Sequence, residues 1–403
     1  MTPVYEGLGM KHNLLEGIRV MDITFFITGP LTTEALAYLG AEVIKVERQN
    51  RLGRGASGSG MTGSMQQSGG KLSITLDFAN PKGLELARRL IATADVVVEN
   101  LAGGALAKRG LSYEEIKKIK PDIIMLSSCM QGQTGPYATH AASGHKLTAL
   151  SGFNQISGWP DREPGWIGAY TDFIAPRFNI IALLAALDYR KRTGKGQYLD
   201  ISQNEAGLQF LAPSILDYNV NHRIADRMGN QSPSSIPHNA YRCLGEDRWC
   251  AISVSTDEEW HSLCEVIGDP ALAQDPRFAT LLARKENEQE LDSLVNGWTS
   301  TRTAEEVMAS MQSAGVSAGV VETAEDMLDH DPQLKARRFF SELDYPGLGK
   351  YHAAPGTYFR LSKYAPEAKR APLMGEHNEY VFKQLLGIPD AEYERLVSDG
   401  VIS

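Results

Sequence analysis

Short apolar runs alternate with helical patterns through the first third of the chain. Runs rich in Val, Ile and Leu are typical of buried strands, whereas apolar positions that recur every three or four residues are typical of helices. The pattern predicts strands at 18–24, 42–46, 72–76, 95–98 and 122–127, and helices at 31–39, 81 onward and 112–119. Strands that alternate with helices imply a parallel sheet covered on both faces. The predicted fold class is therefore α/β, with a Rossmann-like sheet.

Two of these helices carry clear start signals. Asn80 stands directly before Pro81, and Ser112 stands directly before the segment that ends at Ile119. An N-cap side chain accepts a hydrogen bond from a free N–H of the first turn, and proline is tolerated at the first helical position. Both helix starts are therefore predicted at these residues.

The pattern of apolar and polar residues changes near residue 223, where a polar linker begins. The following region predicts a smaller α/β domain over 223–345. Its expected strands are 249–254 and 316–321, and its expected helices are 256–267, 284–298, 303–313 and 324–328. Residues 346–403, with helical patterns at 378–386 and 391–397, are expected to return to the first domain, which covers 1–222.

Composition excludes several classes of partner. The net charge of −9 argues against nucleic acid or an anionic membrane surface as a main partner. No apolar run reaches the roughly 18 residues that span a bilayer, and the N-terminal segment lacks the pattern of a secretory signal. The four cysteines have neither CxxC pairing nor metal-ligand spacing, which favours reduced, buried thiols in a cytoplasmic protein without a metal site.

The common ligand motifs of such sheets are absent. The turn after the first predicted strand, TFFITGP, has a single glycine, Gly29, so the dinucleotide fingerprint is missing. Gly70-Lys71 is followed by Leu72, which excludes a nucleotide-triphosphate loop, and neither HExxH nor GxSxG occurs. A group of cations could instead bind phosphates, or form a solvated basic surface: Lys45, Arg48, Arg51, Arg54, Lys71, Lys108 and Arg109. The Gly/Ser-rich segment 53–70 is either a mobile loop near the site or a surface insertion.

One acid stands out in the stretch GAYTDFIAPRFNIIALLAALDYRKRTGKGQ. Asp172 precedes a long apolar helix that Pro176 is expected to open and Gly194 to close. A loop position before a helix N-terminus favours an ionised carboxylate. Such a carboxylate can be a nucleophile, or it can simply cap the helix.

Several blocks of sequence together resemble the class III CoA-transferases, the family of formyl-CoA transferase and carnitine CoA-transferase. These blocks are LLEGIRVMDIT, LGAEVIKVER, KLSITLDFANPKGLELARRLIATADVVVENLAGGALAKRGL, SSCMQGQTGPYA and RTGKGQYLDIS, and the resemblance runs from about Leu15 to the C-terminus. It implies CoA thioesters as substrates, no permanently bound cofactor, and a covalent intermediate on Asp172. It also implies an interlocked dimer, either of identical chains or with a homologous subunit. The implied CoA contacts are Phe26, Ile27, Thr28, Arg48, Leu76, Asn100, Leu101, Ala105 and Lys108.

The sequence departs from this family pattern near Asp172. The Gln and Glu of formyl-CoA transferase have no counterpart in HAASGHKLTALSG, where His145 or Lys146 could substitute. The glycine-rich lid is replaced by SPSSIPHN. Arg177 could bind a second carboxylate of the substrate, or it could be a helix-surface residue. Several aromatic residues could line a substrate pocket, or pack in the core: Phe25, Phe26, Trp159, Trp166 and Tyr170.

Two other functions stay open at this point. An α-methylacyl-CoA racemase of the same family would shuttle a proton between Asp172 and a histidine, either His145 or His140. A non-catalytic subunit would only support a homologous active chain. The expected reaction is a transfer of CoA from an acyl-CoA donor, for example succinyl-CoA, to a carboxylic acid.

Overall fold

A six-stranded sheet organises the larger part of the chain, in a computed structural model that describes residues 13–47, 67–140, 143–353, 359–364 and 366–403. All neighbouring strands are parallel, and their order is β3-β2-β1-β4-β5-β6. The strands are β1 (Arg19–Ile23), β2 (Glu42–Glu47), β3 (Leu72–Thr75), β4 (Val96–Glu99), β5 (Ile124–Cys129) and β6 (Tyr198–Ser202). The predicted α/β class and parallel sheet are confirmed, and β6 is a strand that the sequence pattern did not predict.

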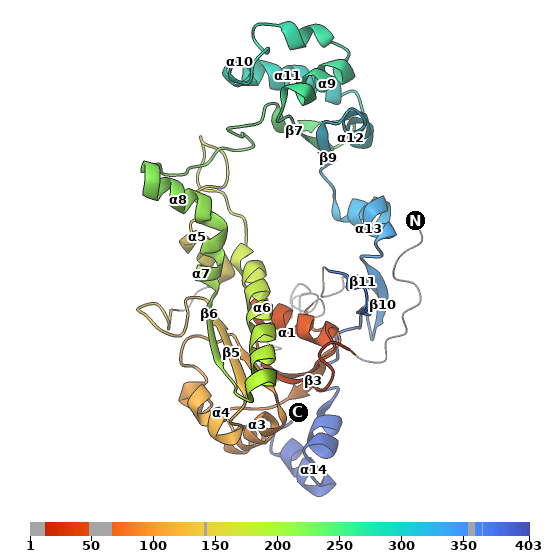
Figure 1. Cartoon of the computed structure of the whole chain (residues 1–403). Helices are drawn as coiled ribbons and strands as arrows, with labels where there is room; N and C mark the ends of the chain where they lie inside the picture. The colour runs from red at the N-terminus through yellow and green to blue at the C-terminus, as the bar shows by residue number, and fades with distance from the viewer. Residues whose placement is uncertain (1–12, 48–66, 141–142, 354–358, 365) are drawn as a thin grey trace. The chain divides into compact units, whose positions relative to one another are not determined.

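Helices cover both faces of this sheet (Figure 1). The helices α1 (Thr28–Tyr38) and α6 (Tyr170–Thr193) lie on one face, and α3 (Pro81–Thr93) and α4 (Tyr113–Ile119) lie on the other. Successive strand residues alternate between the two cores, so Met125 packs toward α3 and α4 while Leu126 packs toward α6. The C-terminal elements η6 (Tyr380–Leu385) and α14 (Asp390–Ser398) complete the core on the α3 face.

Local capping signals place two helix starts correctly. The Asn80 side chain accepts a hydrogen bond from the backbone N–H of Lys82, and the Ser112 hydroxyl accepts one from Glu115. Helix α1 begins at Thr28, three residues before the expected start, because Pro30 is compatible with the first turn of a helix. The predicted C-terminal helix at 391–397 is α14.

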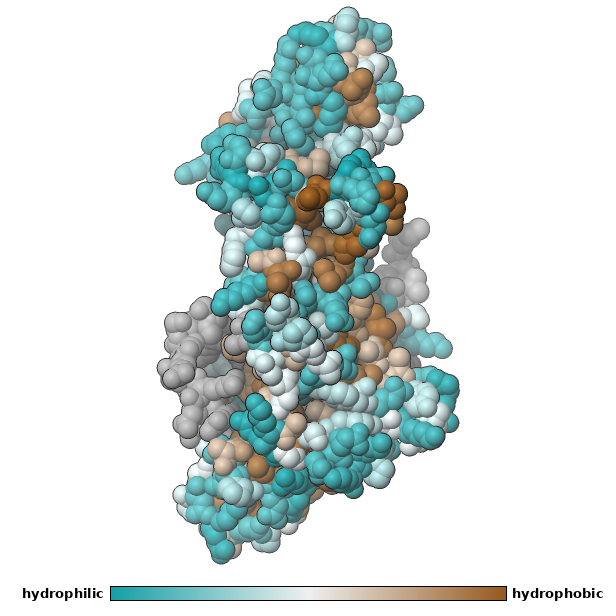
Figure 2. All heavy atoms as spheres, turned by 90° about the vertical axis from the view of Figure 1, so that its left-hand side faces the viewer, coloured by the Kyte–Doolittle hydropathy of each residue, from teal (hydrophilic) through white to brown (hydrophobic). Residues whose placement is uncertain are grey.

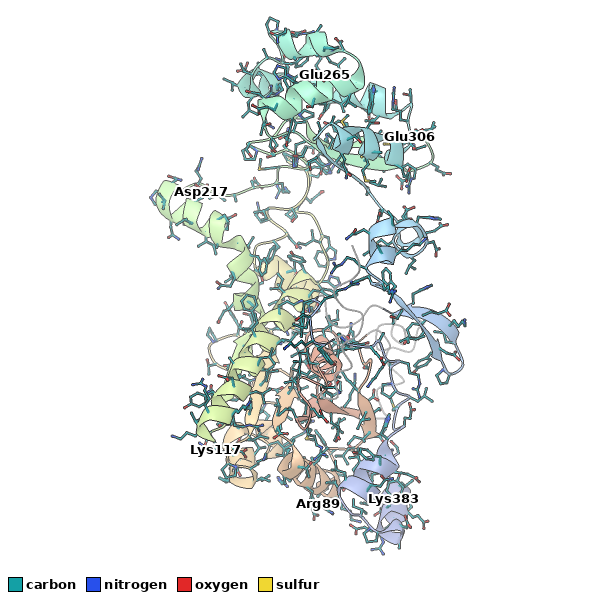
Figure 3. All side chains as sticks on the ribbon, turned by 45° about the vertical axis from the view of Figure 1, so that its right-hand side comes forward. Arg89, Lys117, Asp217, Glu265, Glu306 and Lys383 are labelled. Atoms are coloured by element: carbon teal, nitrogen blue, oxygen red, sulfur yellow. The ribbon has the colours of Figure 1, made fainter. Side chains whose placement is uncertain are left out.

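A second compact unit comprises residues 154–166 and 225–332, and the first unit comprises 1–153, 167–224 and 333–403. The second unit has an antiparallel sheet of β7 (His238–Arg242), β8 (Trp249–Ser253) and β9 (Ser317–Val320). Its helices are α9 (Asp257–Ile267), α10 (Leu281–Glu286), α11 (Glu288–Thr299) and α12 (Ala304–Ser313), around a core that contains Trp260 and Phe278. Glu265 and Glu306 stand on the exposed sides of α9 and α12 (Figure 3).

These units differ from the boundaries expected from sequence at 222/223 and 345/346. Residues 154–166 were expected in the first unit and belong to the second. The hairpin of β10 (Ser341–Tyr345) and β11 (Gly349–Ala353) spans the expected boundary at 345/346 and belongs wholly to the first unit. The short helices α5 (Gly144–Leu150), α7 (Gln203–Leu208), α8 (Ala212–Asn221) and α13 (Pro332–Ala336) were also not predicted. The Gly/Ser-rich segment 53–70 lies mostly outside the described residues.

Helix α6 is the longest element of the first unit. Among the described residues it is the one helix long and apolar enough to cross a membrane, judged by length and composition alone. It packs against α1 and β5, and eight of its residues are buried, including Asp172 and Asn179. The four cysteines are buried and unpaired, as predicted.

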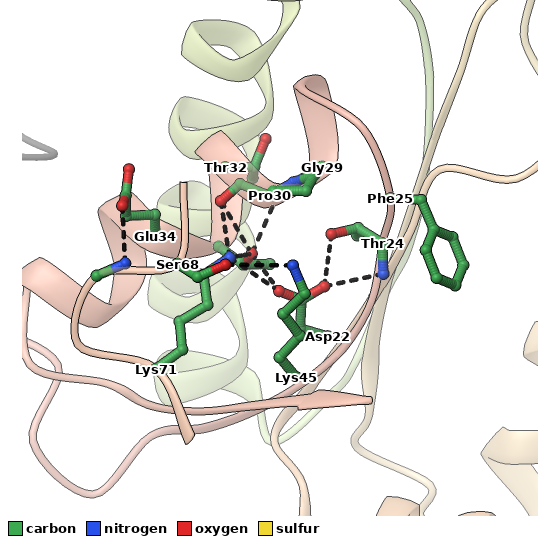
Figure 4. A network of polar contacts seen from close by, with 12 residues as sticks. Asp22, Thr24, Phe25, Gly29, Pro30, Thr32, Glu34, Lys45, Ser68 and Lys71 are labelled. Carbon is green, nitrogen blue, oxygen red and sulfur yellow. Dashed lines mark hydrogen bonds and ion pairs between the residues drawn. The ribbon is translucent and has the colours of Figure 1, made fainter. Parts of the chain in front are cut away.

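A buried ion pair joins the sheet to α1 (Figure 4). Lys71 Nζ lies 3.1 Å from Asp22 Oδ2, and neither side chain is exposed. Lys71 also donates to the carbonyl of Pro30 at 2.9 Å and to Thr33 Oγ1 at 2.8 Å. The Thr33 hydroxyl donates in turn to Asp22 Oδ2 at 2.6 Å. Burial alone would raise the pKa of Asp22, but Lys71, Lys45 and hydrogen bonds from two threonines hold it below its usual value.

This network corrects the interpretation of Lys45 and Lys71 as phosphate-binding cations. Lys45 is 8% exposed and donates to Ser68 Oγ at 3.2 Å, and Lys71 is 3% exposed. Both lysines therefore have structural partners inside the sheet–helix interface. Sequence position alone cannot distinguish a buried lysine with an acid partner from a surface lysine.

We expect Lys71→Met to lower the free energy of unfolding of the first unit by about 3–5 kcal/mol, since it leaves the Asp22 charge buried without its partner. The matched control is Lys82→Met, which removes an exposed pair with Asp399 and should cost less than about 1 kcal/mol. Urea unfolding followed by circular dichroism measures both. All five tryptophans lie in the second unit, so their fluorescence gives an internal reference. Equal midpoints for the two variants would contradict the role assigned to the pair.

Candidate active site

Asp172 lies inside the first turn of α6, not on a loop before it. The helix begins at Tyr170, and Pro176 is an internal residue of the helix. The expectation that Pro176 opens the helix was therefore wrong. Proline has no N–H to donate to the carbonyl four residues earlier, which here is the carbonyl of Asp172. Thr28 Oγ1, from the first residue of α1, donates to that carbonyl at 3.3 Å and so supplies the missing donor.

A second polar contact fixes α6 against α1 and the sheet. The Asn179 side-chain amide donates to Thr32 Oγ1 at 3.0 Å and to Ser128 Oγ at 2.9 Å. Thr32 belongs to α1 and Ser128 to β5, and all three residues are buried. Because buried donors and acceptors are costly to leave unpaired, these contacts define how α6 lies on α1. Asp172 is thereby held at a defined position above the sheet.

The Asp172 carboxyl is largely buried, with 8% of the residue exposed. Burial raises its pKa to about 6, while His145 and the Thr28 hydroxyl act in the opposite direction. A raised pKa means that the ionised form is poorly solvated, and a poorly solvated carboxylate is a better nucleophile than one in water. The carboxyl is still ionised near neutral pH, because its pKa stays below 7.

Gly144 makes room for this carboxyl. A Cβ atom at Gly144, the first residue of α5, would lie 2.2 Å from Asp172 Oδ2 and 2.6 Å from Cγ. Any side chain there would have to displace the carboxyl, since such contacts are far below van der Waals distance. Gly144 belongs to no sequence motif and was not predicted as a site residue. Its only signal was its place beside His145 in the stretch that departs from the family pattern.

Of the three predicted substrate residues, His145 and Tyr170 lie near the start of α6 and Arg177 lies further along this helix. His145 is exposed on α5 and close enough to Asp172 to influence its pKa. Tyr170 is 43% exposed and packs edge-on against Phe153, with ring centroids 5.2 Å apart. Arg177 is half-buried and five residues after Asp172, so the two point to different sides of the helix. Their roles stay predictions. Trp159 and Trp166 lie in the second unit, and Lys146 is exposed.

Most of the predicted CoA contacts lie in the two segments that follow β1 and β4. Phe26, Ile27 and Thr28 form the turn from β1 into α1, and Phe26 is 84% exposed. Asn100 follows β4 directly and bonds to the backbone of Phe25. The remaining described members are Leu101 and Ala105, both half-buried, Lys108, which is exposed, and Leu76, which is buried in the core. Arg48 lies outside the described residues, as do Arg51 and Arg54.

Glu99 supports the segment that carries these contacts, and sequence analysis missed it. Its Oε2 accepts from the backbone N–H of Leu101 at 2.7 Å, and its Oε1 accepts from the Gln133 amide at 3.1 Å. Gln133 accepts in turn from the N–H of Gly104 at 2.9 Å. Burial raises the pKa of Glu99 to about 7. A cavity of about 310 Å³ beside Glu99 opens on the sheet face opposite α6. Among the described residues, no group of three or more His, Cys, Asp or Glu could hold a metal ion.

The fold and site define an α/β protein with a parallel sheet of order 3-2-1-4-5-6 and a poorly solvated carboxylate beside the ends of its central strands. Residues 15–378 match the model of CoA-transferase family III. The chain belongs to this family, and it is therefore an enzyme that transfers CoA.

Individual relatives agree with this assignment. The succinyl-CoA–D-citramalate CoA-transferase of Chloroflexus aurantiacus is 35% identical over 396 residues, covering 96% of this chain and 98% of the relative. The succinyl-CoA:glutarate CoA-transferase of Mus musculus is 32% identical over 400 residues, covering 96% and 90%. The crystal structure of a CaiB/BaiF family protein from Brucella suis is 33% identical, with a TM-score of 0.85, and covers 93% of this chain and 100% of that one.

We expect Gly144→Ala to reduce the rate of CoA transfer about a hundredfold, because the new methyl group must displace the Asp172 carboxyl by roughly 1 Å or more. The control is Gly297→Ala in α11, where the added carbon meets no atom within 4 Å apart from its chain neighbours and the backbone of its own helix. This control should keep full activity. Transfer of CoA from succinyl-CoA to a panel of carboxylic acids measures both variants, and an active Gly144→Ala enzyme would show that the carboxyl does not act from this position.

Proposed function

We propose that this enzyme moves CoA from an acyl-CoA donor of the succinyl-CoA class to a carboxylic acid acceptor, with Asp172 as the covalent carrier. The observation that carries the proposal is the position of the Asp172 carboxyl, buried against Gly144 and adjacent to the turn that bears Phe26 and Thr28. Names of relatives that include succinyl-CoA support the donor class. The acceptor acid is left to experiment.

The reaction follows from carboxylate chemistry in four balanced steps. The Asp172 carboxylate attacks the thioester carbonyl of the donor, which forms a mixed anhydride and releases CoA thiolate. The thiolate attacks the aspartyl carbonyl, which breaks the anhydride, releases the donor acid and leaves Asp172 as a CoA thioester. The acceptor carboxylate attacks this thioester, giving a second anhydride and CoA thiolate. Attack of the thiolate on the acceptor carbonyl then yields the new acyl-CoA and restores the Asp172 carboxylate.

The chain's own residues serve these steps by position and charge. Burial keeps the Asp172 carboxylate reactive, and the nearby His145 stabilises its ionised form. The start of α5 faces the carboxyl across the space left by Gly144. Backbone N–H groups at a helix start are suited to stabilise an oxyanion that develops on the aspartyl group.

The direct test is covalent labelling. Incubation with succinyl-CoA, trapping with hydroxylamine and peptide mapping should place the modification on Asp172. Asp172→Asn should abolish it, while Asp188→Asn, which changes an exposed acid on the same helix, should leave it intact. Asp172→Asn should also be at least as resistant to urea as the wild type, since burial disfavours the ionised carboxyl.

The labelling rate should also depend on pH with a defined sign. It should rise as pH passes through about 6 and level off above, because only the ionised carboxyl attacks.

A comparison of labelling by succinyl-CoA and by butyryl-CoA tests the hypothesis that Arg177 binds a second carboxylate of the substrate. Arg177→Met should remove any preference for succinyl-CoA over butyryl-CoA. Absence of label, together with exchange of the α-proton of a 2-methylacyl-CoA, would replace the proposal with the racemase. Absence of both would indicate a missing partner subunit.

We infer that the active assembly is a dimer of this chain, as the family resemblance implies. Within the first unit, α8 has no buried residue, and Leu216 and Val220 on it are 64% and 67% exposed. Ile181 on α6 is also 67% exposed. Figure 2 views the molecule from the side on which α8 lies and shows hydrophobic surface gathered at the level of that helix. Exposed apolar patches of this kind are typical of protein–protein interfaces.

Light scattering of the pure chain should give about twice its mass of 44.1 kDa. Leu216→Asp on α8 should shift the mass toward that of the monomer, whereas Lys117→Asp on α4, an exposed site on the other side of the sheet, should not (Figure 3). A monomeric wild type would favour a pairing with a homologous chain, as the α and β subunits of the succinyl-CoA–L-malate CoA-transferase of Chloroflexus aurantiacus are named.

A further inference from the structure

The carboxyl ends of β1 and β4 meet where the strand order of the sheet reverses. From β1 the chain continues through β2 and β3 to one edge, and from β4 it continues through β5 and β6 to the other. In doubly wound sheets the connections on either side of this point diverge and leave a crevice, in which ligands bind. Here the two strand ends are Ile23 and Glu99, which are register partners.

One side chain joins the segments that follow these two strand ends. The backbone N–H of Phe25 donates to Asn100 Oδ1 at 2.8 Å, and Asn100 Nδ2 donates to the backbone carbonyl of Phe25 at 2.7 Å. A primary amide offers one acceptor and two donors in a plane, so it can pair with both backbone groups of a single residue. Aspartate lacks the donor, and alanine lacks both groups.

The next residue, Phe26, has an unusual conformation. Its φ angle is +62°, a region that residues with bulky side chains rarely adopt, and the residue is 84% exposed. Such a conformation persists where the surrounding structure holds it from both sides. Asn100 holds the residue before Phe26. After Phe26, the Thr28 hydroxyl donates a hydrogen bond to the backbone carbonyl of Asp172, and the Pro30 carbonyl accepts one from Lys71 Nζ.

We propose that Asn100 is a positioning residue, which holds the Phe26 ring out as an apolar wall for the pantetheine arm of the CoA thioester. The inference rests on the proposed function and deepens it. The Asn100 oxygen and one N–H are already used on Phe25, so the effect of Asn100 on CoA affinity passes through the conformation of Phe26. Asn100 therefore differs in role from a residue that contacts CoA independently.

A double-mutant cycle on CoA binding, measured by calorimetry, separates the two roles. Phe26→Ala and Asn100→Ala are each expected to weaken the binding of CoA about tenfold. The double variant should also bind about tenfold more weakly than the wild type, because Asn100 has nothing left to position. A hundredfold loss, the product of the single effects, would overturn the inference and assign Asn100 an independent contact with CoA.

Asn100→Asp gives a second cycle if the alanine variant folds poorly, since aspartate keeps the acceptor for the Phe25 N–H and loses the donor. It should show the same non-additivity with Phe26→Ala. The control is Asn80→Ala, which removes the N-cap of α3 and should lower stability without changing CoA affinity. Binding of CoA needs no covalent step. If the two substitutions are non-additive in binding but Asp172 is not labelled, the proposed mechanism is wrong and the role of Asn100 stands. If Asp172 is labelled but the substitutions are additive, the mechanism stands and the role of Asn100 is wrong.

Discussion

The buried ion pair between Lys71 and Asp22 is the interaction on which the geometry of the site depends. Removing two charges from water costs several kcal/mol for each ion, and their attraction offsets this only when the remaining donors and acceptors are satisfied. Here Lys71 has three partners from β1 and α1, and Asp22 accepts further hydrogen bonds from Thr24. The pair is satisfied only when α1 starts where it does, so it fixes the start of that helix against β1 and β3.

From α1, the same logic extends to Asp172. Thr28 and Thr32 project from α1 to α6, where they bond to the Asp172 carbonyl and to Asn179. A seam of polar contacts is directional, whereas apolar packing between two helices tolerates small shifts. Pro176 makes the position of Asp172 depend still more on α1, because it lacks the N–H that a regular helix would have supplied to the Asp172 carbonyl. The position of Asp172 therefore follows from residues more than 100 positions earlier in the chain.

This long-range origin explains which parts of the structure could be predicted from sequence. Helix starts at Asn80 and Ser112 were predictable because a cap acts within three residues. The start of α6 was not, because the local rule for Pro176 favours a first-turn proline and the compensating hydroxyl comes from Thr28. Lys71 and Lys45 were interpreted as cations that bind phosphate or face solvent, because their partners, Asp22 and Ser68, are distant in sequence. Gly144 and Glu99 carry no motif, and their importance appears only as a missing Cβ and a pair of hydrogen bonds.

A raised pKa does not by itself single out Asp172, because Glu34 and Glu99 are also buried and have pKa values raised to about 7. Their oxygens have structural tasks. Glu34 accepts from the backbone N–H of Gly69, and both oxygens of Glu99 hold the segment after β4. The pKa of Asp22 is instead lowered, because its carboxylate forms an ion pair with Lys71. Asp172 combines a poorly solvated carboxyl with an oxygen that faces a glycine at a helix start, beside the ends of the central strands. Environments that push similar groups toward different pKa values and partners separate structural acids from reactive ones. This contrast supports the proposal that Asp172, of these four acids, is the one that attacks the thioester.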